Sequence, residues 1–201
     1  MAPARPRPPP RMPTWPVYLL GLVPAVYYFW QGIYGDLGAD PLKVLEHALG
    51  EWALRFLIAG LAVTPLRREL GINLLKYRRA LGLLAFLYVL LHLGVYAVLD
   101  QGLDWRSVGA DILRRPYITV GMAGFLLLLP LAATSFNAAI RWLGGRNWSR
   151  LHKLVYPAAL AGALHYVMLV KSWPLEPLVY AAIVLALLGW RLWRGRSHRA
   201  P

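Results

Sequence analysis

The sequence predicts an all-α protein, a polytopic bundle of six transmembrane helices with both termini in the cytoplasm. Three observations lead to this fold class. Of the 201 residues, 58% are hydrophobic and only 15% are charged, a composition typical of a membrane protein and not of a soluble domain of this length. The apolar residues fall into separate runs, each close to the ~20 residues that a helix needs to cross a bilayer. The positive charges gather between alternate runs.

The chain divides into two tails and one membrane domain. Residues 1–16 are rich in proline and arginine, so we expect a disordered basic cytoplasmic tail, and residues 194–201 form a second basic tail. The first apolar run contains Pro24 and Trp30 where a cleaved signal would have a small-residue site, which favours a retained signal anchor. Residues 17–193 form the membrane domain, with expected helices at about 17–34, 47–66, 80–99, 117–137, 152–170 and 177–193.

The lysines and arginines indicate the orientation. With the N-terminus inside, sixteen of the 22 lie on the inner side, five on the outer side and Arg55 within a helix. This bias is typical of cytoplasmic loops, so both termini are expected inside. The net charge of +13 is therefore a topology signal and does not indicate nucleic-acid binding, which needs a basic face. The loops at 67–79 and 100–115 are amphipathic and are expected to lie along the interface.

The chain has no cysteine, which excludes disulfides, thiolate-held iron–sulfur clusters, covalent c-type haem and a thiol nucleophile.

Two histidines stand inside apolar runs, where an imidazole is costly unless something binds it. His92 follows Arg79 by thirteen residues, and His165 follows His152 by thirteen. At 1.5 Å per residue both lie roughly 20 Å from the inner surface, in the outer half of the membrane, on helices that run in the same direction. A level pair of imidazoles on two helices is the arrangement of the axial ligands of one haem iron.

Small residues beside the pair predict a slot for the porphyrin. They are Ala158, Ala161 and Gly162 on the face of His165, and Gly82 and Ala85 on the face of His92. The structural alternative is that the small residues only allow close helix packing, and that each histidine donates a hydrogen bond to a carbonyl or hydroxyl.

His152 is expected at the inner interface, and its level partner on the 80–99 helix is Arg79. A straight helix would place His152 and His165 about 140° apart, although Pro157 is expected to kink it. Two roles for His152 stay open, a haem ligand or an interfacial hydrogen-bonding residue. Four cations lie near His152 in the sequence: Arg78, Arg79, Arg150 and Lys153. Two interpretations stay open for them: they bind haem propionates or a flavin phosphate, or they are the basic residues that ordinarily flank transmembrane helices on the cytoplasmic side.

The other candidate residues have plainer interpretations. His47 and His198 have no level partner and are expected to be solvated. Glu51 and Arg55 are four residues apart and are expected to form a local ion pair. Met122 and Met168 are interpreted as gap fillers, because two histidines are available as ligands.

Three stretches resemble a known family: RRALGLLAFLYVLLHLGVY at 78–96, RRPYITVGMAGFLLLLPLAATS at 114–135 and LGGRNWSRLHKLVYPAALAGALHYVMLVK at 143–171. They are similar to the MsrQ family, the haem-binding membrane subunits of bacterial periplasmic protein-methionine-sulfoxide reductases, and more widely to ferric reductase-like transmembrane proteins. The resemblance covers nearly all of the chain from about residue 17.

This resemblance implies an inner-membrane subunit that passes electrons through haem b to a periplasmic molybdenum-containing partner. That partner reduces methionine sulfoxide, so no catalytic residue is expected here. The resemblance also implies FMN, and it maps the cofactor-binding histidines onto His92, His165 and His152. Arg79 stands where two-haem relatives have a fourth histidine. The electron donor is open between a cytosolic flavin reductase and a quinone.

Two other functions remain as alternatives. One is a stand-alone ferric or quinone-linked reductase at the membrane surface. The other is a small transporter in which the histidines relay protons, although the halves of the sequence show no internal repeat.

Overall fold

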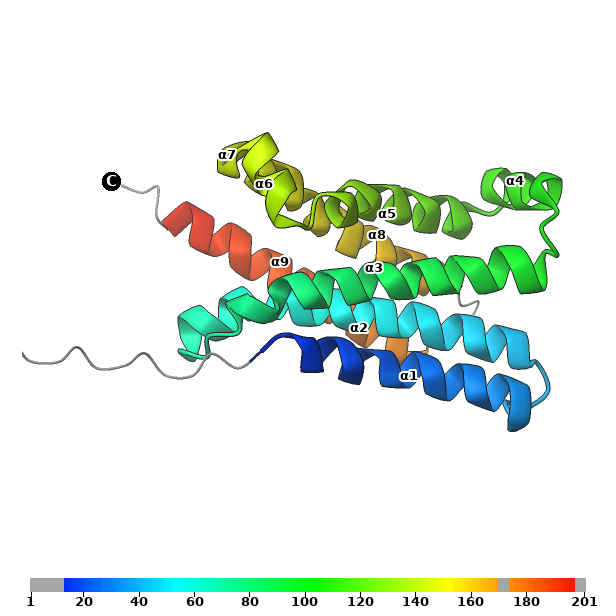
Figure 1. The fold of residues 1–201 in the computed structure, drawn as a ribbon. Helices are drawn as coiled ribbons and strands as arrows, with labels where there is room; N and C mark the ends of the chain where they lie inside the picture. The colour runs from blue at the N-terminus through cyan, green and yellow to red at the C-terminus, as the bar shows by residue number, and fades with distance from the viewer. Residues whose placement is uncertain (1–12, 170–173, 198–201) are drawn as a thin grey trace, which may run out of the picture.

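The computed structural model describes residues 13–169 and 174–197, which fold into helices without a β-strand (Figure 1). The all-α prediction is therefore confirmed for these residues. Six longer helices coincide with the six predicted runs: α1 (Trp15–Tyr34), α2 (Pro41–Glu69), α3 (Arg78–Gly94), α5 (Pro116–Ala133), α8 (Val155–Leu169) and α9 (Leu175–Ser197). Shorter pieces join them: the 3₁₀ turns η1 (Leu75–Tyr77) and η3 (His152–Leu154), the π turn η2 (Val95–Asp100), and α4 (Trp105–Arg114), α6 (Asn137–Leu143) and α7 (Gly145–Leu151).

Four segments of the described chain are long and apolar enough to cross a membrane: Pro41–Glu69, Leu75–Asp100, Pro116–Ala133 and Leu175–Gly195. The chain thus has membrane-spanning character, and the count of six spans stays a prediction. Most of residues 1–16, the end of the predicted 152–170 helix and the last residues of the 194–201 tail, including His198, lie outside the described residues.

Two helix starts differ from the expectation. α2 begins at Pro41 because the Asp40 side chain caps it, accepting from the Lys43 backbone N–H at 3.2 Å. The helix expected at 152–170 begins only at Val155, after the turn η3. Pro157 has no N–H to donate to the carbonyl of Lys153, so the predicted interruption by Pro157 falls at the start of the helix.

The expected interfacial loop at 100–115 contains the helix α4. Its Val108 is buried, whereas Trp105 and Leu113 are exposed. One face of α4 thus packs on the bundle, and its other face carries apolar side chains outward, as in a helix that lies along a membrane interface.

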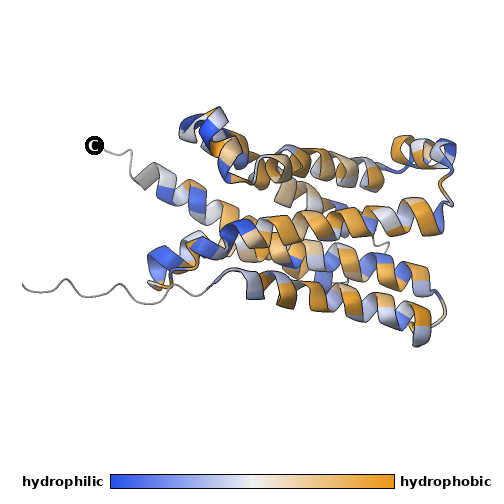
Figure 2. Ribbon diagram, viewed as in Figure 1, coloured by the Kyte–Doolittle hydropathy of each residue, from blue (hydrophilic) through white to orange (hydrophobic). Residues whose placement is uncertain are grey.

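The helices form two close pairs, α2 with α3 and α5 with α8, and α9 packs on α8. α1 lies along the outside of α2 and α3 (Figure 1). The first and last described residues lie at the same end of the bundle, together with α6 and α7, while α4 lies at the opposite end (Figure 1). Figure 2 shows apolar residues along the middle of the helices, and hydrophilic residues collected at the α2–α3 link, on α7 and towards the end of α9.

Tyr88 fastens α1 to α3. Its ring is completely buried, and its hydroxyl accepts from the Ala25 N–H at 2.9 Å and donates to the Gly21 carbonyl at 2.7 Å. These two groups would pair directly in an uninterrupted α-helix. The hydroxyl is therefore inserted into the hydrogen-bond ladder of α1, next to the proline at position 24.

Candidate haem site

His92 stands on α3, near the α4 end of the bundle, and its ring packs against α2. Its Nδ1–H donates to the backbone carbonyl of Glu46 at 2.9 Å, because a carbonyl can only accept. The ring also lies against Gly50 of α2, where an added Cβ atom would lie 3.2 Å from His92 Nδ1. The other nitrogen, Nε2, is 4.0 Å from a carboxylate oxygen of Glu46, which is too long for a hydrogen bond.

His165 is held in the same manner by the other helix pair. It stands on α8, and its Nδ1–H donates to the carbonyl of Tyr117 on α5 at 2.7 Å. Its ring lies against Gly121, where an added Cβ atom would come within 2.7 Å of Nδ1. Both histidines therefore have the same tautomer, with the proton on Nδ1 and a lone pair on Nε2.

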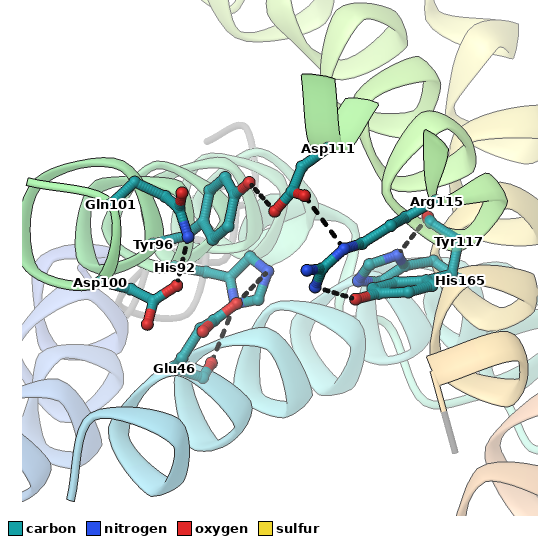
Figure 3. A network of polar contacts seen from close by, with 9 residues as sticks. All are labelled: Glu46, His92, Tyr96, Asp100, Gln101, Asp111, Arg115, Tyr117 and His165. Carbon is teal, nitrogen blue, oxygen red and sulfur yellow. Dashed lines mark hydrogen bonds and ion pairs between the residues drawn. The ribbon is translucent and has the colours of Figure 1, made fainter. Parts of the chain in front are cut away.

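The two rings lie opposite each other in the same cavity. Their centroids are 6.1 Å apart and their planes meet at 80°, and Figure 3 shows their second ring nitrogens turned towards the space between them. A metal–imidazole bond is about 2 Å long and the ring centre lies about 1 Å further, so two imidazoles on opposite sides of one metal ion have centres about 6 Å apart. The predicted pairing of His92 with His165 fits this geometry.

A cavity of about 230 Å³ surrounds the pair, and both histidines line it. Its walls contain many small residues: Gly50, Ala53, Gly121, Gly124, Ala158 and Gly162. Ala158 and Gly162 thus lie where the sequence placed them. The other predicted slot residues lie elsewhere: Gly82 lines a second cavity, Ala85 is buried in the apolar core, and Ala161 is next to Gly124.

These residues fit a haem. The described residues contain no group of three or more His, Cys, Asp or Glu side chains that could hold a free metal ion. A haem iron needs only two ligands from the protein, and His92 and His165 offer two Nε2 atoms from rings whose centroids are 6.1 Å apart. The cavity also has cationic side chains at its edge, Lys43 and Arg115, which are suited to carboxylate groups such as propionates.

A chain of polar contacts fixes Arg115 beside the cavity (Figure 3). Its guanidinium lies 3.0 Å from the carboxylate of Asp111 and donates to the Tyr117 hydroxyl at 3.2 Å. The Tyr96 hydroxyl donates to the same carboxylate at 3.0 Å. The contacts with Asp111 tie α4 and the turn η2 to the start of α5, the helix whose carbonyl binds His165.

A second cavity of about 490 Å³ opens towards the α6–α7 end. His152, Arg78, Arg79 and Lys153 all line it, so the structure brings together the residues predicted around His152. Arg79 also donates to the Asn137 side chain at 2.9 Å.

His152 differs from the other two histidines in its contacts. Its Nε2 is 3.1 Å from the Thr134 hydroxyl, which itself donates to the Pro130 carbonyl at 2.7 Å. Its ring stacks on Trp148 with centroids 3.9 Å apart. The arrangement matches the interfacial hydrogen-bonding role, because the nitrogen that His92 and His165 leave free is engaged here.

The remaining candidates are mostly as expected. Glu51 and Arg55 form the predicted ion pair at 3.0 Å. The Tyr166 hydroxyl donates to Glu51, and the Arg55 guanidinium donates to the Tyr180 hydroxyl. Met122 lines the haem cavity, whereas Met168 is exposed. The prediction of a solvated His47 is only partly right, because His47 is half-buried and lines the edge of the cavity.

Sequence reasoning missed the residues that act through the backbone. Neither the glycines Gly50 and Gly121 nor Glu46 and Tyr117, whose carbonyls accept from the histidines, are distinguished by the sequence pattern. The sequence offers one signal, because Arg115 belongs to a pair of arginines on the predicted outer side, where cations are otherwise few.

Comparison with known proteins identifies the family of this chain. The model of the ferric reductase like transmembrane component family matches residues 48–163. A Brucella anthropi protein named protein-methionine-sulfoxide reductase heme-binding subunit MsrQ is 58% identical over 188 residues, covering 93% of this chain and 85% of that protein. Proteins with the same name from Brucella ovis and Brucella melitensis are 61% identical over 180 residues, covering 90% of this chain and 81% of theirs. No solved structure matches the chain significantly.

Proposed function

This chain belongs to the ferric reductase-like transmembrane family, and on that premise we propose that it is the haem b electron-transfer subunit of a protein-methionine-sulfoxide reductase. The pairing of His92 and His165 across one cavity is the observation that carries the proposal. A haem b with two histidine ligands supplies reversible one-electron transfer and leaves no open position for chemistry on a bound ligand. Reduction of the sulfoxide then belongs to the catalytic subunit.

Each part of the site has a separate task in this function. His92 and His165 would hold the haem iron through Nε2, and the carbonyls of Glu46 and Tyr117 orient the two imidazoles. Arg115 and Lys43 neutralise anionic groups at the edge of the cavity. The apolar walls keep water away from the centre of the site, which favours electron transfer over side reactions.

The proposed orientation places the α6–α7 end and both termini in the cytoplasm, with the chain crossing the bacterial inner membrane six times. The positive-inside bias supports it, because the basic residues around His152 gather at that end. The haem pair then lies in the periplasmic half, close to α4, and the proposed acceptor is a periplasmic molybdenum-containing reductase subunit.

We propose that the second cavity binds a further redox cofactor with anionic groups, either a second haem or FMN. Arg78, Arg79 and Lys153 line it and suit propionates or a phosphate. Leu57 and Leu128 line both cavities, so one layer of side chains separates them. A cytosolic flavin reductase or a membrane quinone would supply electrons at this end.

The test is the reduced-minus-oxidised visible spectrum of the detergent-purified protein, measured together with the haem-to-protein ratio. We expect a low-spin b-type spectrum that is lost in His92→Ala and in His165→Ala, whereas the control His198→Ala retains it. His152→Ala shows whether the second cavity adds a haem to the count. A colourless wild-type protein from cells with adequate haem, or full haem content in both ligand variants, would refute the proposal. The intact subunit should also support methionine sulfoxide reduction by its partner.

A further inference from the structure

The two haem-facing histidines share one local arrangement although they stand on different helix pairs. In each case the histidine donates to the carbonyl of a residue on the paired helix, and its ring lies against a glycine four residues later on that helix. The carbonyl and glycine are Glu46 and Gly50 for His92, and Tyr117 and Gly121 for His165. The same spacing occurs twice, which points to a common physical requirement.

The requirement follows from helix geometry. In an α-helix the carbonyl of one residue points along the axis towards the N–H of the residue four positions later. A side-chain donor that reaches this carbonyl from a neighbouring helix must pass beside that later residue. Any Cβ atom there would occupy the path of the imidazole, and glycine is the residue that allows such an approach. The distances agree, since an added Cβ atom would lie 2.7 Å from His165 Nδ1 and 3.2 Å from His92 Nδ1.

We propose that Gly50 and Gly121 are positioning residues for the haem ligands, a role that rests on the proposed haem-binding function. Each glycine lets one imidazole reach its carbonyl, and the carbonyl then holds the proton on Nδ1, makes the ligand more electron-donating and fixes the ring plane. Together they set the angle of 80° between the two imidazole planes.

This angle has a spectroscopic consequence. Parallel imidazole planes on a low-spin ferric haem split the two iron orbitals that interact with the ligand π systems, whereas perpendicular planes leave them nearly equal in energy. A nearly perpendicular pair therefore gives a strongly anisotropic electron paramagnetic resonance signal with one dominant low-field feature. The midpoint potential depends on the same hydrogen bonds, because an electron-donating imidazole stabilises the ferric state.

The experiment compares Gly121→Ala and Gly50→Ala with wild type, using Gly94→Ala as the matched control. Gly94 is on α3 two residues after His92, and an added Cβ atom there would meet nothing within 4 Å. All three changes replace glycine by a better helix former, so helix propensity does not distinguish them. The purified ferric proteins are measured by electron paramagnetic resonance, and the midpoint potential of each haem is obtained by redox titration.

Wild type and Gly94→Ala should give the strongly anisotropic signal. Gly121→Ala should lose this signal or shift it towards three resolved features, with a higher midpoint potential, and Gly50→Ala should show a smaller change in the same direction. If the Gly121→Ala protein cannot be produced, the measurements on Gly50→Ala test the positioning role. Variants with wild-type signals and potentials, or an equal change in Gly94→Ala, would overturn the positioning role while leaving the haem function intact. Absence of any haem signal from wild type would instead refute the proposed function.

Discussion

Replacing Tyr88 by phenylalanine tests how α1 is attached to the rest of the bundle. The change keeps the ring, which is 0% exposed, and removes only the hydroxyl. Two backbone groups then lose their partner, the Ala25 N–H at 2.9 Å and the Gly21 carbonyl at 2.7 Å. A buried polar group left without a partner costs about 1–3 kcal/mol.

The expected loss for Tyr88→Phe is about 1–3 kcal/mol in total and not twice that, because α1 can partly restore the direct bond between the two groups. The free energy of unfolding is measured by titration of the detergent-solubilised protein with sodium dodecyl sulfate. Tyr34→Phe is the matched control, since it makes the same chemical change on α1, the helix that Tyr88 contacts, at a side chain that is 71% exposed. A Tyr88→Phe protein as stable as this control would refute the reasoning. The haem spectrum should remain unchanged, because α1 carries neither ligand.

Three further predictions address the two cavities and a helix cap. Thr134→Val should alter cofactor binding in the second cavity and leave the His92/His165 haem spectrum unchanged, because the hydroxyl that it removes contacts His152 and the Pro130 carbonyl and neither of the other two histidines; Thr64→Val on α2 is the control. Arg115→Gln should release haem to apomyoglobin roughly two- to fivefold faster than Arg106→Gln does, as expected from the loss of one partly exposed charge pair. The Lys43 side chain, bonded to the Asp40 carboxylate, holds the pKa of Asp40 below its ordinary value, so the stability advantage of wild type over Asp40→Asn should be present at neutral pH. It should disappear in unfolding titrations as the pH falls through the ordinary range of aspartate and below.

The closeness of His92 and His165 could be predicted from the sequence because depth in a membrane is a simple function of residue number. Thirteen residues after Arg79 and after His152 place two imidazoles at one level, and the structure brings these rings to 6.1 Å. The helices could also be predicted, since hydrophobic composition decides their existence. The short helices α4, α6 and α7 could not, because they depend on how the chain turns at the membrane surface.

The glycines beside the ligands could not be recognised for a different reason. Glycine is common in membrane helices wherever two backbones come close, so Gly50 and Gly121 look like any other packing residue in the sequence. Their special role depends on which carbonyl each histidine reaches, and that choice is made by the pairing of α2 with α3 and of α5 with α8. Helix pairing is a property of the whole bundle, whereas the sequence pattern describes one helix at a time.

The different contacts of the histidines in the two cavities explain why the sequence predicts the pairing of His92 with His165 but leaves the number of haems open. His92 and His165 use Nδ1 for a backbone carbonyl and leave Nε2 free, whereas His152 has its Nε2 on Thr134 and its ring against Trp148. A second haem ligated by His152 would require the Thr134 contact to break, and the level position on α3 offers the guanidinium of Arg79 in place of an imidazole. A flavin would require neither change, because it needs only an aromatic wall and cations for its phosphate. These contacts argue against a second bis-histidine haem in this cavity, and a haem-to-protein ratio near one in wild type and in His152→Ala is the expected result.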